Sequence, residues 1–188
     1  LAISFFLLSL ASHAVQTNWS FFTIEKFGWS EKMIGISLGV VGILVALVQG
    51  LLIRYTSPLL GNKKSIFFGL LFYSLGLFLF AFANQGWMMF VFLIPYCLGG
   101  IAGPALQSII SSSVHNNEQG ELQGSLTSLI SLTSILGPPL MTSLFAYFTR
   151  PSAPVHFSGV SFLLGGILML LSAFCAYLAL KTKGVSVI

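Results

Sequence analysis

The sequence predicts an all-α membrane protein with six transmembrane helices arranged as two inverted triplets. Of its 188 residues, 56% are hydrophobic and only 6% are charged, whereas about 25% of an ordinary soluble domain is charged. The apolar residues also form repeated runs of about 20 residues, the length that crosses a 30 Å hydrocarbon core at 1.5 Å per residue. Lipid offers the backbone no hydrogen-bond partners, so such runs are expected to be helices.

Six runs meet this length: residues 2–22, 33–53, 65–83, 87–106, 126–147 and 160–180. The connections between them are short, which predicts a compact antiparallel bundle. We therefore expect residues 1–188 to form one six-helix domain with both chain ends on the same side of the membrane.

The few charges indicate orientation. Eight Lys and Arg against four Glu give a formal net charge of +4, too little and too scattered for a nucleic-acid partner. One side is expected to carry Arg54, Lys63, Lys64, Lys181 and Lys183, and the other Lys26, Lys32 and Arg150. The positive-inside rule makes the first side, with both ends, cytoplasmic. Interfacial anchors are expected on the opposite face at Trp19, Trp29 and Trp87.

The start of the chain, its cysteines and the residues of its spans argue against a signal peptide, a metal site and an enzyme. The chain begins at Leu1 without a basic leader or cleavage site, so we expect no signal peptide and a start inside a longer protein. Cys97 and Cys175 lie in apolar runs without a CxxC spacing, which favours buried hydrophobes over metal ligands. No cofactor or metal is expected. The spans also lack a paired acid or a Ser–His arrangement, so no enzyme is expected.

The six runs differ in polarity. The third is rich in Phe and the sixth has little polarity, so both are predicted to face lipid on most sides. The other four carry a polar or small-residue stripe at helical spacing. This three-plus-three pattern is typical of inverted repeats in secondary transporters, with two cavity-lining helices in each triplet.

Each stripe has two interpretations, because faces of Ser, Thr and Gly in membrane helices serve either packing or binding. The first helix carries Ser9, His13, Gln16, Thr17 and Ser20, and the second carries Gly35, Gly39, Gly42, Ala46 and Gly50 with Gln49 beside them. The fourth carries Tyr96, Gly100, Gly103 and Gln107, and the fifth carries Thr127, Ser131, Ser134 and Pro138.

Three polar side chains are the sharper candidates: His13, Gln16 and Gln107. A polar group left unpaired in hydrocarbon costs several kcal/mol, so each needs a partner helix, water or a ligand. His13 is also ionisable near the middle of a span, which favours a functional role. It could carry a proton, or it could be a neutral imidazole bonded inside the bundle.

Two helices contain breaking residues. Gly103 and Pro104 are expected to break the fourth helix, and Gly137, Pro138 and Pro139 to interrupt the fifth. Either break could be a moving gate or a static bend. Glu118 and Glu121, at the start of the fifth helix, are interpreted as residues that stabilise its N-terminus.

Four segments resemble a known family: residues 27–30, 35–38, 100–107, and 118–125 leading to Gly137 and Pro138. They resemble the C-terminal half of a major facilitator superfamily transporter, closest to the tetracycline-resistance branch of drug:proton antiporters. The resemblance implies a twelve-helix carrier working by alternating access, in which this chain supplies helices seven to twelve. Gln49 matches a cavity glutamine of those pumps, whereas Val45 and Tyr73 stand where they typically carry His and Asp.

The expected function is therefore the C-terminal half of a proton-coupled exporter of a drug-like small molecule in a bacterial inner membrane. Its expected partners are the substrate, protons, lipid and an N-terminal six-helix half outside this chain. Substrate contacts are expected from His13, Gln16, Gln49, Tyr96 and Gln107. The alternative is a self-contained six-helix channel or membrane scaffold.

Overall fold

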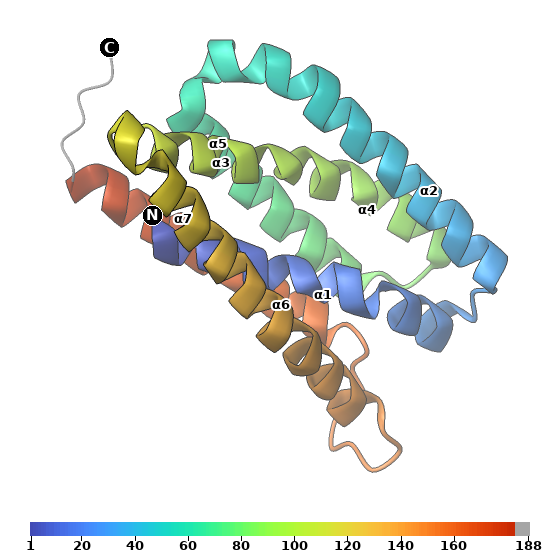
Figure 1. The fold of residues 1–188 in the computed structure, drawn as a ribbon. Coiled ribbons are helices and arrows are strands. Elements are labelled where there is room, and N and C mark those ends of the chain that lie inside the picture. Colours follow the sequence, from blue (N-terminus) through green and yellow to red (C-terminus); the bar gives the residue numbers. More distant parts are fainter. Residues whose placement is uncertain (183–188) are drawn as a thin grey trace.

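A computed structural model describes residues 1–182, and the side chains of these except 55–60, 116 and 182. Lys183 lies outside the described residues. Within residues 1–182 every regular element is helical (Figure 1), as predicted. The elements are α1 (Ala2–Phe27), α2 (Glu31–Leu47), η1 (Val48–Leu52), α3 (Ile53–Phe82), α4 (Gly86–Leu98), η2 (Gly99–Ile101), α5 (Ala102–Ser111), η3 (Asn116–Glu118), α6 (Gln119–Thr149) and α7 (Val160–Thr182).

Five helical stretches in the described chain are long and apolar enough to cross a membrane: Glu31–Leu52, Gly61–Phe82, Gly86–Ser111, Gln119–Thr149 and Val160–Lys181. Helix α1 is as long as these stretches, with 26 residues. It falls outside the set because His13, Gln16 and Asn18 lower its hydropathy. The one helix that is too polar for this criterion therefore carries two of the three sharper candidates.

The helices run up and down between two ends of the bundle. Figure 1 shows the start of α1 and the end of α7 at the same end as the turn near residue 61 and the turn that precedes α6. The remaining connections, at residues 28–30, 83–85 and 150–159, lie at the other end.

The turn between the second and third spans is shorter than expected. We expected a connection over residues 54–64, but helix continues through this stretch except at Gly61. Gly61 has φ 71° and ψ 158°, which a residue without a Cβ adopts at no steric cost. The connection between the two spans is therefore a short helical stretch over residues 53–60 that ends at a kink at Gly61.

The packing pairs the two triplets in a regular way. Helix α1 packs against α6 and α7, and helix α4 packs in the corresponding way against α2 and α3. Helices α3 and α7, the last of each triplet, pack against each other. The first helix of each triplet thus packs against the last two helices of the other triplet, as expected for a three-plus-three repeat.

The third span has one face buried in the bundle, whereas Phe68, Leu71 and Leu75 stay exposed, so the surface left for lipid is narrower than predicted. Ile66, Leu70, Leu77 and Phe80 are fully buried, and the Ser74 hydroxyl donates to the Gly166 carbonyl of α7 at 3.0 Å. Apolar composition cannot distinguish a helix surrounded by protein from one surrounded by lipid, because both environments favour the same side chains.

One expected interfacial anchor is also internal. Trp19 is 2% exposed, donates from Nε1 to the Ser37 hydroxyl at 2.9 Å and stacks edge-on against Phe80. It therefore joins α1 to α2. Trp87 is 59% exposed and remains available as an anchor.

The proline positions disturb the helices less than expected. In the fourth span the irregular turn is η2, at Gly99–Ile101, just before Pro104. Proline removes the N–H that would bond to the carbonyl four residues earlier, here Gly100, so the distortion lies in the preceding turn. Helix α6 continues through Pro138 and Pro139, so the fifth span is not broken there, and a kink or gate at Gly137, Pro138 and Pro139 stays a prediction.

Candidate functional site

The imidazole of His13 lies against the backbone of α6. A Cβ built on Gly137 would lie 2.5 Å from Cδ2 of His13 and 2.6 Å from its Cγ. No side chain fits in that space, so position 137 must be glycine for α1 and α6 to approach this closely. His13 is half-buried, and it stands beside the Pro138–Pro139 pair that follows Gly137.

Gln107 bridges two helices at the exposed side of the bundle. Its Nε2 donates to Oε1 of Gln123 on α6 at 3.2 Å. Gln123 in turn donates to the Ser111 hydroxyl at 3.3 Å, and Gln119 donates to the Ser111 carbonyl at 2.8 Å. Side chains of α5 and α6 are thus joined by a polar cluster that includes Gln119 and Gln123, which we had not singled out.

The polar stripe of α6 extends further than the sequence analysis placed it. Gln119 and Gln123 precede Thr127 and Ser131 at steps of four residues, so they share a helix face with the predicted stripe. Continuing that stripe backward by two turns would have identified both glutamines. Six exposed polar residues of α1, α5 and α6 belong to the predicted stripes or to this extension, and we call this set the polar face: Gln16, Gln107, Gln123, Thr127, Ser131 and Ser134.

Gln49 lies in an irregular stretch of its own. It is exposed and sits in η1, a π-helical turn over Val48–Leu52. Such turns are rare in proteins, and those that occur often lie at functional sites. An open apolar hollow of about 280 Å³ lies beside this turn, lined by Leu47, Val48, Leu51, Leu52 and Leu98.

Tyr96 is placed apart from the other candidates. It is 7% exposed, and its ring packs edge-on against Tyr73 at 4.8 Å between centroids. The Tyr73 hydroxyl donates to the Tyr96 hydroxyl at 3.4 Å. A Cβ on Gly76 would lie 2.7 Å from the Tyr96 backbone, so this region is a tight contact between α3 and α4.

Asn18 is a buried polar residue that we had not selected. It is 0% exposed, and its Nδ2 donates to the Met141 carbonyl of α6 at 2.9 Å. The Ser161 hydroxyl of α7 donates to the same carbonyl at 2.9 Å. Within the described chain the Asn18 Oδ1 has no hydrogen-bond partner. Three helices therefore meet at one carbonyl, two residues after Pro139.

The glycine face of α2 is open. A Cβ added at Gly35, Gly39, Gly42 or Gly50 would meet no atom within 4 Å in the part of the chain that is described. Only 6% of the most apolar window of this span is buried. The small residues of α2 therefore face away from the six-helix bundle.

The family model of the Major Facilitator Superfamily matches residues 1–186. This chain belongs to the major facilitator superfamily. The match covers all six helical spans, and it confirms the resemblance and the fold class that the sequence indicated. Superfamily members are transporters, so the chain is an integral membrane protein and not an enzyme.

The curated relatives come mainly from one branch. The chain is 39% identical over 166 residues to "Tetracycline resistance protein, class C" of Escherichia coli, covering 88% of this chain and 41% of that protein. It is 42% identical over 146 residues to "Tetracycline resistance protein, class E" of Escherichia coli, covering 78% and 36%. It is 28% identical over 148 residues to "Hippocampus abundant transcript-like protein 1" of Homo sapiens, covering 79% and 29%.

The tetracycline resistance proteins confirm the branch expected from the sequence. The chain spans less than half the length of the curated relatives it matches.

Proposed function

We propose that this chain is the C-terminal half of a proton-coupled exporter of drug-like small molecules, working by alternating access in a bacterial inner membrane. The observation that carries the proposal is the polar face, with its hydrogen bond between Gln107 and Gln123 across α5 and α6. Polar side chains directed into acyl chains cost several kcal/mol. The polar face is therefore expected to border a water-filled cavity that admits a solute.

A companion bundle is part of the proposal. The relatives named as tetracycline resistance proteins are more than twice as long as the matched region, and the glycine face of α2 is open. Small residues let a neighbouring helix approach closely. We propose that an N-terminal six-helix half covers this face and closes the cavity.

Substrate contacts are assigned to Gln16, Gln49, Gln107 and Gln123. His13 lies at the edge of the same region, against Gly137. Tyr96 is given a positioning role, because its hydroxyl accepts a hydrogen bond from Tyr73 between α3 and α4. Tetracycline is the first substrate to test, because the tetracycline resistance proteins named above carry that word in their names.

Proton coupling is assigned mainly to the companion half. The four glutamates, Glu25, Glu31, Glu118 and Glu121, lie at or beyond helix ends in this chain. His13 is the candidate proton carrier within a span. Both chain ends are proposed to be cytoplasmic, because Arg54, Lys63, Lys64 and Lys181 lie at their end of the bundle.

Everted membrane vesicles containing the full-length protein test the proposal. Tetracycline uptake should require an imposed pH gradient and stop on addition of a protonophore. Replacing both Gln107 and Gln123 with alanine should lower uptake at least about tenfold, the effect of losing roughly 1.4 kcal/mol of substrate interaction. The control Ser113→Ala, an exposed serine just after α5 whose hydroxyl donates to the Ile109 carbonyl, should transport normally. Ion conductance without drug flux would instead support a channel.

A further inference from the structure

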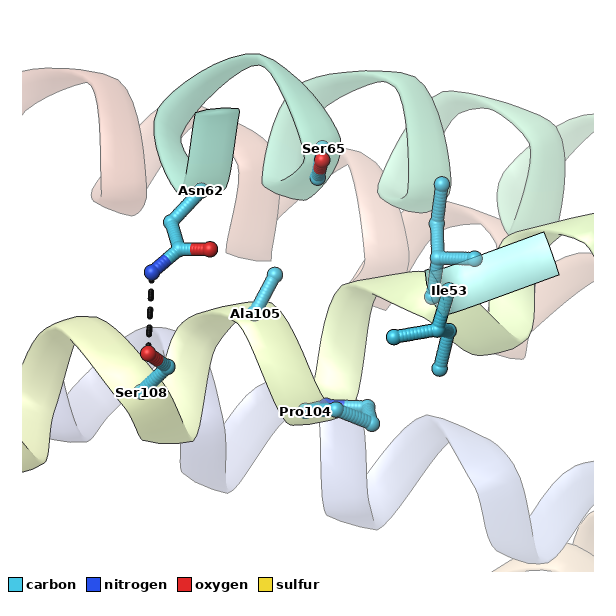
Figure 2. A pocket seen from close by; sticks show the side chains of 7 residues that line it. Ile53, Asn62, Ser65, Pro104, Ala105 and Ser108 are labelled. Carbon is cyan, nitrogen blue, oxygen red and sulfur yellow. Dashed lines mark hydrogen bonds between the residues drawn. The ribbon is translucent and has the colours of Figure 1, made fainter. Parts of the chain in front are cut away.

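A second pocket lies between the start of the third span and the fourth span, and none of its lining residues belongs to the polar face. It has a volume of about 170 Å³ and is lined by Ile53, Asn62, Ser65, Ile101, Pro104, Ala105 and Ser108. Figure 2 shows Asn62 and Ser65 on one helix facing Ala105 and Ser108 on the other. The Asn62 Nδ2 donates to the Ser108 hydroxyl at 2.8 Å and closes one side.

Ser65 is the residue that indicates a ligand. It is 3% exposed, it lines the pocket, and its hydroxyl has no hydrogen-bond partner among the described residues. Leaving a buried hydroxyl unpaired costs about 1–3 kcal/mol. Its neighbours along the helix offer it no compensation, so the partner it lacks is expected to enter from the pocket.

The polar groups of the pocket favour an acceptor-rich, negative ligand. The Ser65 hydroxyl can donate, and the Ser108 hydroxyl, which accepts from Asn62, can donate its own proton. Lys63 and Lys64 lie between two lining residues in the sequence, and Arg54 follows a third. A helix also restarts after Gly61, and the N–H groups of a first helical turn attract anions.

The acidic residues at this end of the bundle belong to other elements. Glu118 and Glu121 lie at the start of α6, which supplies none of the lining residues. The rest of the wall, Ile53, Ile101, Pro104 and Ala105, is apolar. The pocket therefore combines two hydroxyl donors with a hydrocarbon wall at the end of a membrane helix, and Arg54, Lys63 and Lys64 adjoin its lining residues in the sequence.

We propose that this pocket binds a phosphate group, with the Ser65 hydroxyl as a donor and Lys63 and Lys64 as counter-charges. Two sources carry this chemistry: the headgroup of an anionic phospholipid, and a soluble phosphate. The apolar wall fits the glycerol and the first acyl carbons of a lipid. The site shares no lining residue with the polar face, so its occupancy is not expected to depend on what the protein transports.

Binding is measured on the purified, delipidated full-length protein in detergent. Native mass spectrometry records retention of dioleoylphosphatidylglycerol or dioleoylphosphatidylcholine, and a separate titration uses inorganic phosphate. The test variants are Ser65→Ala and the pair Lys63→Gln with Lys64→Gln. The matched controls are Ser113→Ala, whose hydroxyl bonds to the Ile109 carbonyl, and Lys181→Gln, whose amine lies over the Tyr177 ring.

Phosphatidylglycerol should bind more tightly than phosphatidylcholine, and Ser65→Ala should weaken its binding about tenfold, as for a lost hydrogen bond to a charged group. The lysine pair should weaken it further, most strongly at low salt. Neither control should change it. Ser65→Ala should fold normally, because no observed hydrogen bond is lost, and an unchanged unfolding midpoint will separate lost binding from lost structure.

Comparing lipid binding with inorganic phosphate binding shows whether the phosphate group belongs to a lipid headgroup or to a soluble ligand. Phosphate binding that Ser65→Ala weakens in parallel would support the proposal with a soluble ligand, and lipid binding without phosphate binding would support it with a headgroup. Equal retention of both lipids, or equal effects of Ser65→Ala and Ser113→Ala, would overturn it.

Discussion

The ring of His13 occupies the space that any side chain at position 137 would need, with Cδ2 2.5 Å from a Cβ built on Gly137. The contact joins α1 to α6 immediately before two prolines. Because packed interiors tolerate little extra volume, this pair fixes the separation of the two helices on which most of the polar face lies.

Gly137→Ala is expected to destabilise the protein by about 1–3 kcal/mol, the usual cost of overpacking. His13→Ala should relieve much of that cost, so the double variant should be more stable than the two single effects predict. Thermal unfolding of all four proteins in detergent measures this coupling. Additive effects would show that the two residues do not compete for the same space.

Asn18 should matter through its amide nitrogen and not its oxygen. Asn18→Ala removes the hydrogen bond to the Met141 carbonyl and leaves a cavity. We therefore expect the free energy of unfolding to fall by about 2–4 kcal/mol. Asn18→Leu should lose less, because it fills the space and removes the Oδ1 that has no partner in the described chain. In both variants the Met141 carbonyl still accepts the hydrogen bond from the Ser161 hydroxyl. Equal unfolding midpoints for the two variants would contradict this interpretation.

Two glycines should respond in opposite ways to the same substitution. Gly76→Ala places a Cβ 2.7 Å from the backbone of Tyr96. Backbone atoms cannot move aside as a flexible side chain can, so we expect the free energy of unfolding to fall by at least about 2 kcal/mol. Gly120→Ala, in the first turn of α6, meets no described atom within 4 Å and should be neutral or slightly stabilising. Unfolding midpoints measure both. Similar losses in both would indicate a general helix effect.

Helical spacing predicted which residues share a face, but not which residues they meet. His13 could be selected because an ionisable group inside a span is costly. Its contact with Gly137 depends on how α1 and α6 are rotated about their axes, and no local pattern fixes that rotation. Gln123 could have been found by extending the stripe of α6, whereas Asn18 belongs to no stripe.

The apolar helices were predicted less well than the polar ones. The third span has the composition of a lipid-facing helix, yet Phe80 and Leu77 are fully buried in protein. Helix α6 contains two prolines and still continues as a helix, which the sequence pattern did not predict. The π-helical turn at Gln49 has no local sequence signal, since such turns depend on packing as well as on propensity.

The most direct test compares two positions near the middle of their helices with a water-soluble maleimide. In a Cys97→Ala, Cys175→Ala background, cysteine is placed at Ser131 on the polar face of α6 or at Leu171 on α7, which is 47% exposed. If the polar face borders water, the Ser131→Cys protein should be labelled in intact membranes and the Leu171→Cys protein should stay unlabelled in lipid. Labelling of Leu171→Cys alone, or equal labelling of both, would contradict the account.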